Sequence, residues 1–146
     1  MYKKVLVPLD GSELAECVLA HVEALAKGCQ AVEIEFVQVH APFQIPPGME
    51  PIPLKLAEIA EISAQEKKAT EDYIRQVVER FDPGPAKVRG MVLSGPVTEM
   101  LTDYIAKNDI DLVVMATHGS SGISRWVWGS VTDRLLRSSC APVLMV

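Results

Sequence analysis

Apolar, strand-like runs alternate with helix-like segments along the whole chain, and this alternation constrains the fold most. Five apolar runs are expected to be strands, at 3–9, 31–39, 87–93, 111–117 and 142–146. Helices are expected at 13–27, 54–81, 97–107 and 131–137. Strict alternation is typical of parallel strands joined by right-handed crossovers. The sequence therefore predicts a single α/β domain over residues 1–146, an open five-stranded parallel sheet with helices on both faces.

The first helical segment has signals at both ends. Ser12 is expected to cap its amino end, and Gly28 is expected to end it. Six residues recur at helical spacing and are expected to form its buried stripe: Leu14, Cys17, Val18, His21, Val22 and Leu25. This helix is therefore expected to turn the stripe toward the protein interior.

Two loops carry residues suited to a ligand, and each follows a predicted strand. Pro8-Leu9-Asp10-Gly11-Ser12 follows the first strand, and Thr117-His118-Gly119 follows the fourth. In an open α/β sheet, ligands bind beyond the carboxyl ends of the strands, where the strand order reverses. The two loops share one crevice only if the first and fourth strands are neighbours. The expected sheet order is therefore 3-2-1-4-5.

The loop after the fourth strand is rich in small residues and leads into the last helix. Nine residues separate Gly119 from Gly129-Ser130, and Ala116 lies three residues before Gly119. Glycines let a ligand approach the backbone, and the N–H groups at a helix N-terminus attract phosphate. The pattern predicts a phosphate-binding loop without a basic patch. A plain turn role for Gly119, and a capping role for Ser130, remain alternatives.

Charge and composition exclude several classes of protein. The net charge of −5 argues against a nucleic-acid partner, since phosphate backbones require clustered Lys and Arg. No apolar run approaches the roughly 20 residues that span a bilayer, so no membrane insertion is expected. The first residues lead straight into a strand, which predicts no signal peptide and a cytoplasmic location. Cys17, Cys29 and Cys140 are expected to be reduced.

Motifs of several familiar enzymes are absent from the sequence. It contains no GxxxxGK[ST], no GxGxxG after the first strand and no GxSxG. No general base, nucleophile–base pair or carboxylate cluster is evident near the glycine loop. We therefore assign no catalytic residue and no metal ligand from the sequence.

The chain resembles the universal stress protein family over essentially its whole length. The resemblance rests on the opening strand with Pro8-Leu9-Asp10-Gly11-Ser12, the strand ending in Val39-His40, and the glycine loop. The ATP-binding branch has the signature G-x-x-G, nine residues, then G-[ST]; Ala116 stands here in place of the first glycine. The resemblance implies an adenine nucleotide alpha hydrolase-like fold. It also implies an ATP site formed by Pro8, Asp10, Ala41, Ala116, Gly119, Gly129, Ser130, Val131 and Thr132.

The resemblance further implies where each part of the nucleotide lies. Pro8 and Asp10 are expected at the adenosine end, and the backbone of Ala41 at the adenine edge. Ala116 is expected beside the ribose, where its methyl group would crowd the ligand if the backbone needed a positive φ. The remaining residues would surround the phosphates. Mg²⁺ or Mn²⁺ is the expected companion of those phosphates.

These inferences predict an ATP-binding cytoplasmic regulatory protein of the stress response, holding ATP, ADP or AMP and acting on an unknown regulatory protein partner. Hydrolysis is expected to be weak or partner-dependent. One alternative is a slow ATPase, or a self-phosphorylating enzyme that uses Ser120, Ser121 or Ser130. The other is a nucleotide-free dimeric interaction module, which Ala116 favours.

The chain ends in an uncharged strand, Pro142–Val146. An unpaired apolar edge strand invites association. We therefore expect a homodimer in which this strand pairs antiparallel with its copy about a two-fold axis.

Overall fold

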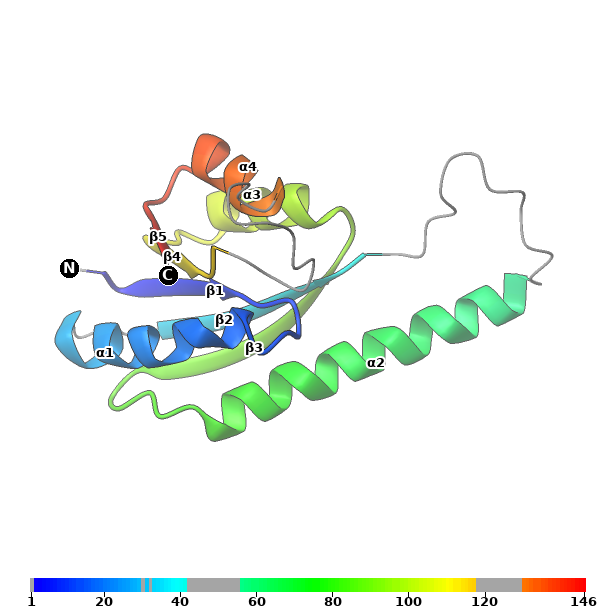
Figure 1. Ribbon diagram of the computed structural model, residues 1–146, viewed down its shortest axis with the longest axis horizontal. Coiled ribbons are helices and arrows are strands. Elements are labelled where there is room, and N and C mark those ends of the chain that lie inside the picture. Colours follow the sequence, from blue (N-terminus) through cyan, green and yellow to red (C-terminus); the bar gives the residue numbers. More distant parts are fainter. Residues whose placement is uncertain (1, 30, 32, 42–55, 118–129) are drawn as a thin grey trace.

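The computed structural model describes residues 2–29, 31, 33–41, 56–117 and 130–146, and the side chains of 56, 57 and 130 are not among the described parts. Its sheet has five parallel strands: β1 (Lys4–Pro8), β2 (Glu33–His40), β3 (Lys87–Ser94), β4 (Leu112–Met115) and β5 (Val143–Met145). Their spatial order is β3-β2-β1-β4-β5, which confirms the predicted order (Figure 1).

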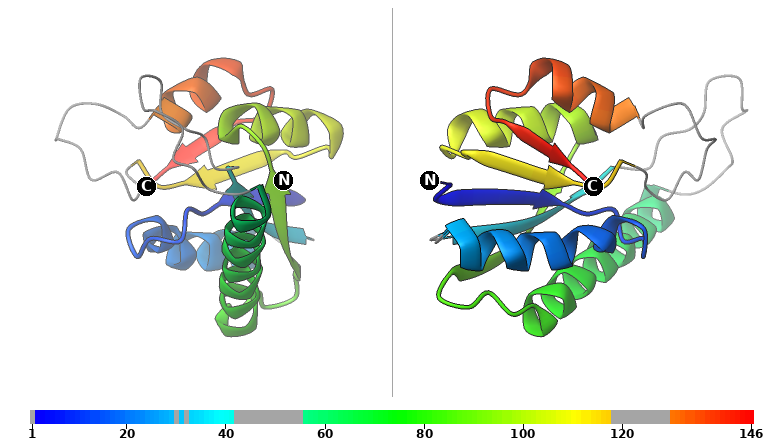
Figure 2. Two further views of the ribbon diagram at one scale, coloured as in Figure 1. Left: turned by 90° about the vertical axis from the view of Figure 1, so that its right-hand side faces the viewer. Right: turned by 60° about the vertical axis from the view of Figure 1, so that its left-hand side comes forward.

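The helices cover both faces of the sheet, as predicted. They are η1 (Ala15–Val18), α1 (Leu19–Cys29), α2 (Leu56–Arg80), α3 (Val97–Lys107) and α4 (Ser130–Ser138). Figure 2 shows α3 and α4 on one side of the sheet and α1 and α2 on the other. With 25 residues, α2 is about 37 Å long, and it extends past the carboxyl ends of the strands (Figure 1).

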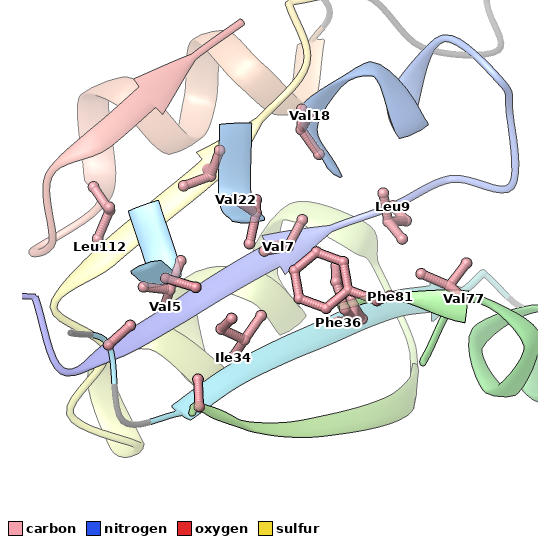
Figure 3. Packing of buried hydrophobic residues seen from close by; sticks show 14 of the residues in the cluster. Val5, Val7, Leu9, Val18, Val22, Ile34, Phe36, Val77, Phe81 and Leu112 are labelled. Atoms are coloured by element: carbon pink, nitrogen blue, oxygen red, sulfur yellow. The ribbon is translucent and has the colours of Figure 1, made fainter. Parts of the chain in front are cut away.

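Each face of the sheet has its own apolar core. On the α1 and α2 side, Val18 and Val22 pack with residues of β1 and β4, and Phe36 meets Phe81 edge to face at 4.9 Å between ring centroids (Figure 3). On the other side, Leu101 of α3 and Leu135 of α4 pack on the sheet. Burial on both faces fits the apolar sequences of the central strands.

The first helix differs from the prediction at both ends. Ser12 does act at its start, because the Ser12 hydroxyl oxygen accepts a hydrogen bond from the Ala15 N–H at 3.1 Å. The first turn, however, is the 3₁₀ helix η1. Gly28 does not end the helix, which continues to Cys29, and the Ala31 N–H bonds the Ala26 carbonyl at 3.2 Å. Glycine lowers helix propensity by only about 1 kcal/mol, which the packing of α1 on the sheet outweighs.

The predicted stripe on this helix is only partly buried. Val18 and Val22 are buried and Leu25 is partly buried, but Leu14, Cys17 and His21 are exposed. The prediction that the whole stripe faces the interior is therefore wrong for a single chain. The sheet covers only the side of the helix that carries Val18 and Val22.

A fully buried glutamate, Glu35, is the third residue of β2. The carboxylate of Glu35 accepts hydrogen bonds from Arg89 Nη2 at 2.7 Å and from the Tyr104 hydroxyl at 2.9 Å. Lys4 Nζ lies 3.3 Å from the same carboxylate, and Glu33 pairs with both cations. The network links β1, β2, β3 and α3. Sequence analysis missed the network, because its members are far apart in the sequence.

The hydrogen bond of the Tyr104 hydroxyl makes the stability of the fold depend on pH in the alkaline range. Burial and the hydrogen bond to Glu35 raise the pKa of Tyr104 to about 12. Since this pKa lies above the ordinary value of about 10, the stabilisation is complete below pH 10 and is lost as the pH rises through 12. When the pH is raised from 9 to 12, we expect the free energy of unfolding to fall less in Tyr104→Phe than in the natural chain. Urea unfolding at both pH values measures this difference, and equal losses would contradict it.

Candidate functional site at the carboxyl edge of the sheet

Two predicted ligand loops begin at neighbouring strand ends. β1 pairs with β4, with Val5 opposite Leu112 and Leu6 opposite Val113. The chain leaves β1 toward α1 on one face and reaches β4 from α3 on the other, so the strand order reverses between them. This is the position at which open α/β sheets bind ligands. The prediction that the two loops begin at the ends of neighbouring strands is therefore confirmed.

The loop after β1 is held in shape by its own side chains. Asp10 Oδ1 accepts hydrogen bonds from the Ser12 N–H at 3.0 Å and from the Ser12 hydroxyl at 2.6 Å. Between them, Gly11 has a φ of +83°, a left-handed conformation that glycine adopts without strain. Asp10 itself remains exposed at the edge of the sheet. It therefore has a structural role, orienting Ser12, alongside the binding role that sequence predicts.

The side chain of Gln38, on β2, lies next to Gly11 of this loop, and sequence analysis did not identify it. A Cβ atom built on Gly11 would lie 3.4 Å from Gln38 Nε2. Within the described part of the chain, Gln38 Oε1 is buried and has no hydrogen-bond partner. Such an atom is usually satisfied by water or a ligand. The available signal in the sequence was a polar residue that follows the apolar residues Ile34 and Phe36 on the same face of the strand.

The end of β4 is fastened to the end of the chain. The Thr117 N–H and hydroxyl both donate to the Val146 carbonyl, at 2.9 and 3.1 Å, and the Val146 N–H donates to the Met115 carbonyl. Ala116, between them, is partly buried against the core. Among the described residues other than glycine, positive φ occurs at Asp109 alone. Ala116 therefore does not have a positive φ, the conformation in which its methyl group was expected to crowd the ligand.

The other predicted site residues fall into two groups. Pro8 ends β1, and Ala41 follows β2 as an exposed residue, so both lie at the same edge as Asp10 and Ala116. At the start of α4, Val131 is partly buried and the Thr132 side chain is buried at 4% exposure. Ser130 is the first residue of α4, as a phosphate-binding helix start requires. Gly119 and Gly129 lie outside the described residues.

At the same edge, a contact joins β2 to the extended half of α2. His40 Nε2, at the end of β2, lies 3.4 Å from the Ser63 hydroxyl oxygen. No cluster of three or more histidine, cysteine or acidic side chains that would hold a metal ion occurs in the described ranges. None of the helices in those ranges is long and apolar enough to cross a membrane. The metal that accompanies the nucleotide stays a prediction.

The sheet order, the two helical layers and the site at the strand switch define an open, doubly wound α/β protein. Comparison with known proteins identifies its family. The chain belongs to the universal stress protein family, whose model matches residues 1–146. This confirms the resemblance seen in the opening strand and the glycine loop.

Individual relatives match over most of their length. Universal stress protein MJ0531 of Methanocaldococcus jannaschii is 28% identical over 147 residues, covering 100% of this chain and 82% of the relative. Universal stress protein MJ0577 of the same organism is 26% identical, with coverage of 100% and 95%, and its structure matches with a TM-score of 0.74. UspA of Lactobacillus plantarum has a TM-score of 0.82 at 20% identity, covering 99% of this chain and 97% of UspA, which shows a shared fold.

Two solved structures of this fold are described with a bound nucleotide. One is a universal stress protein in complex with cAMP, with a TM-score of 0.70 at 19% identity, covering 99% of this chain and 96% of that one. The other is a family member from Arabidopsis thaliana with AMP bound, with a TM-score of 0.56 at 14% identity and coverage of 99% and 90%. At these identities the likeness shows the fold only.

Proposed function

We propose that this chain binds an adenine nucleotide, ATP with Mg²⁺ or Mn²⁺, in the crevice between the loops after β1 and β4. In this proposal it acts as a cytoplasmic regulatory protein of the stress response, through a protein partner that the bound nucleotide favours. The observation that carries the proposal is the pairing of β1 with β4, which starts both loops at adjacent strand ends. The AMP and cAMP of structural relatives support the class of ligand.

The proposed roles follow the order of the strand ends. Asp10 is exposed at the end of β1 and would accept hydrogen bonds at the adenosine end, while Ala41 after β2 would offer its backbone to the adenine edge. Ala116 after β4 would lie beside the ribose, and Ser130 at the start of α4 among the phosphates. Gly119 and Gly129, with no Cβ atom, would allow the phosphates to approach the backbone.

Replacing Asp10 by alanine is expected to weaken the binding of Mg–ATP by at least about tenfold, because a hydrogen bond to a charged group contributes about 1.5–3 kcal/mol. Calorimetry on protein stripped of carried-over nucleotide measures this. Asp10→Asn keeps an oxygen that can accept from Ser12, so it tests the contribution of the negative charge while the hydrogen bonds of the loop are retained. The matched control is Asp103→Ala, which removes an exposed aspartate of α3 that pairs with Lys107.

Three outcomes decide the proposal. Loss of affinity in Asp10→Ala with full affinity in Asp103→Ala is the expected result. Unchanged affinity in Asp10→Ala would place the nucleotide outside the crevice. Failure of the natural chain to bind ATP, ADP or AMP would favour the nucleotide-free interaction module.

We also propose that the protein is a homodimer that pairs through β5. In the described sheet, β5 is the edge strand beside β4, and Leu144 on it is 38% exposed. An uncharged edge strand offers unpaired N–H and C=O groups to a second chain. Antiparallel pairing about a two-fold axis would cover the strand in both copies.

A further inference from the structure

Two polar atoms are buried on the α2 side of the sheet, and neither has a hydrogen-bond partner within the described part of the chain. They are Oε1 of Gln38, on β2, and the hydroxyl oxygen of Tyr73, on α2. Burying a polar group costs stability unless another group bonds it, and nearly all such groups in proteins are satisfied. The proposed nucleotide contacts use neither atom, so both need another explanation.

Contacts along β2 and α2 place these two side chains at the same level. Phe36 and Val77 belong to one apolar core (Figure 3). Nearer the carboxyl edge, His40 Nε2 lies 3.4 Å from the Ser63 hydroxyl oxygen. The glutamine lies between Phe36 and His40 on the same face of β2, since side chains alternate along a strand. The tyrosine lies between Val77 and Ser63 on α2, so both side chains lie between the same two contacts.

Both side chains also adjoin the turn that begins the loop after β1. The Gln38 amide lies against Gly11, where an added Cβ atom would be 3.4 Å from Nε2. Burial, together with the nearby carboxylates of Glu16 and Asp10, raises the pKa of Tyr73 above its ordinary value. The Tyr73 hydroxyl therefore keeps its proton and can donate a hydrogen bond. Since Asp10 and Gly11 are adjacent, the two buried atoms lie on the inner side of one turn.

The two atoms have complementary chemistry, although they do not bond each other. The tyrosine hydroxyl is a donor, and the glutamine oxygen is an acceptor. One water molecule can accept a hydrogen bond from the first and donate one to the second. Internal waters usually make about three hydrogen bonds to buried polar groups of this kind.

We infer that Gln38 and Tyr73 hold an internal water on the inner side of the turn, and that through this water they position Asp10 for the nucleotide. The inference rests on the proposed nucleotide site and adds two positioning residues to it. Asp10 is exposed, whereas the two atoms are shielded from solvent, so the nucleotide lies on the outer side of the turn. The third hydrogen bond of the water goes to the backbone of the turn, which links the turn to β2 and α2.

The first test is a double-mutant cycle on urea unfolding, with Gln38→Met and Tyr73→Phe alone and combined. Each single variant is expected to lower the folding equilibrium constant about threefold to tenfold, because it removes one hydrogen bond of the water. The double variant should lower it little more than one single variant does, because either change releases the same water. The matched control combines Gln38→Met with Tyr104→Phe. Their effects should multiply, since Tyr104 bonds Glu35 and packs in the core on the other face of the sheet.

The second test measures the affinity for Mg–ATP by calorimetry. Gln38→Met and Tyr73→Phe are each expected to raise the dissociation constant at least about fivefold. In an Asp10→Ala background, the same changes should raise it less than about twofold, because they act through Asp10. A purely structural role would not produce this dependence on Asp10. Tyr104→Phe, which removes a hydroxyl from the other face of the sheet, should leave the affinity unchanged.

Each result decides a part of the inference. Non-additive unfolding together with a loss of affinity that requires Asp10 supports it. Single variants as stable as the natural chain, or effects that multiply, overturn the shared water. Unchanged affinity overturns the positioning role, and an equal loss in the Asp10→Ala background overturns positioning through the turn. If the natural chain binds none of ATP, ADP and AMP, the proposed function and the positioning role both fail, while the unfolding cycle still decides the water site.

Discussion

Arg89→Met is expected to lower the free energy of unfolding by about 2–4 kcal/mol, because it removes a cation from the fully buried carboxylate of Glu35. The value lies below the usual cost of breaking a buried pair for two reasons. Lys4 Nζ stays 3.3 Å from that carboxylate, and the Arg89 side chain is itself 54% exposed. Urea unfolding followed by circular dichroism measures the change.

A surface arginine provides the comparison for Arg89. Arg75 of α2 pairs with Asp72 and Glu79 and is 63% exposed, so Arg75→Met should change stability by less than about 0.5 kcal/mol. Combining Glu35→Met with Arg89→Met should recover much of the loss, since no buried carboxylate is left unpaired. Equal effects of Arg75→Met and Arg89→Met would contradict a stabilising role for the network.

Gly90→Ala is expected to lower the free energy of unfolding by about 2–3 kcal/mol, through crowding between β3 and α2. A Cβ atom at Gly90 would lie 2.5 Å from Ile74 Cγ2 and 2.9 Å from Val78 Cγ2, closer than van der Waals contact allows. Ile74 is buried, so it cannot move away without disturbing its neighbours. Thermal and urea unfolding both report the loss.

Another glycine separates this crowding from a general effect of adding a methyl group. A Cβ atom at Gly28, inside α1, would meet nothing within 4 Å. Gly28→Ala is therefore expected to raise stability by up to about 1 kcal/mol through helix propensity. If Gly90→Ala were as stable as the natural chain, α2 would have to sit farther from β3 than it does in this structure.

The sequence predicted the arrangement of elements because that arrangement depends on local patterns. Periodicity and turn residues place α3 at the predicted bounds, Val97–Lys107. The strand order followed from the chemistry of two loops, one beginning with Asp10 and one after Thr117, which can cooperate only if β1 and β4 are neighbours. The Asp10–Ser12 turn was likewise within reach, since all of its partners are close in the sequence.

What the sequence did not predict depends on contacts between distant segments. Glu35 is 54 residues from Arg89 and 69 from Tyr104, so no periodicity signals their meeting. Gln38 beneath Gly11 is the same kind of contact across two elements. The stripe through Leu14 shows a different limit: spacing identifies an apolar helix face, but it does not say whether the same chain or another one covers it.

The buried network and the candidate site lie toward opposite ends of the strands. Lys4 and Glu33 begin β1 and β2, whereas Asp10 and Ala41 follow the ends of the same strands. Loops at the carboxyl edge can therefore be exchanged or lengthened while the ionic network keeps the strands in register. This scaffold should accept grafted loops after β1, β2 and β4, and should tolerate insertions there far better than at the opposite edge.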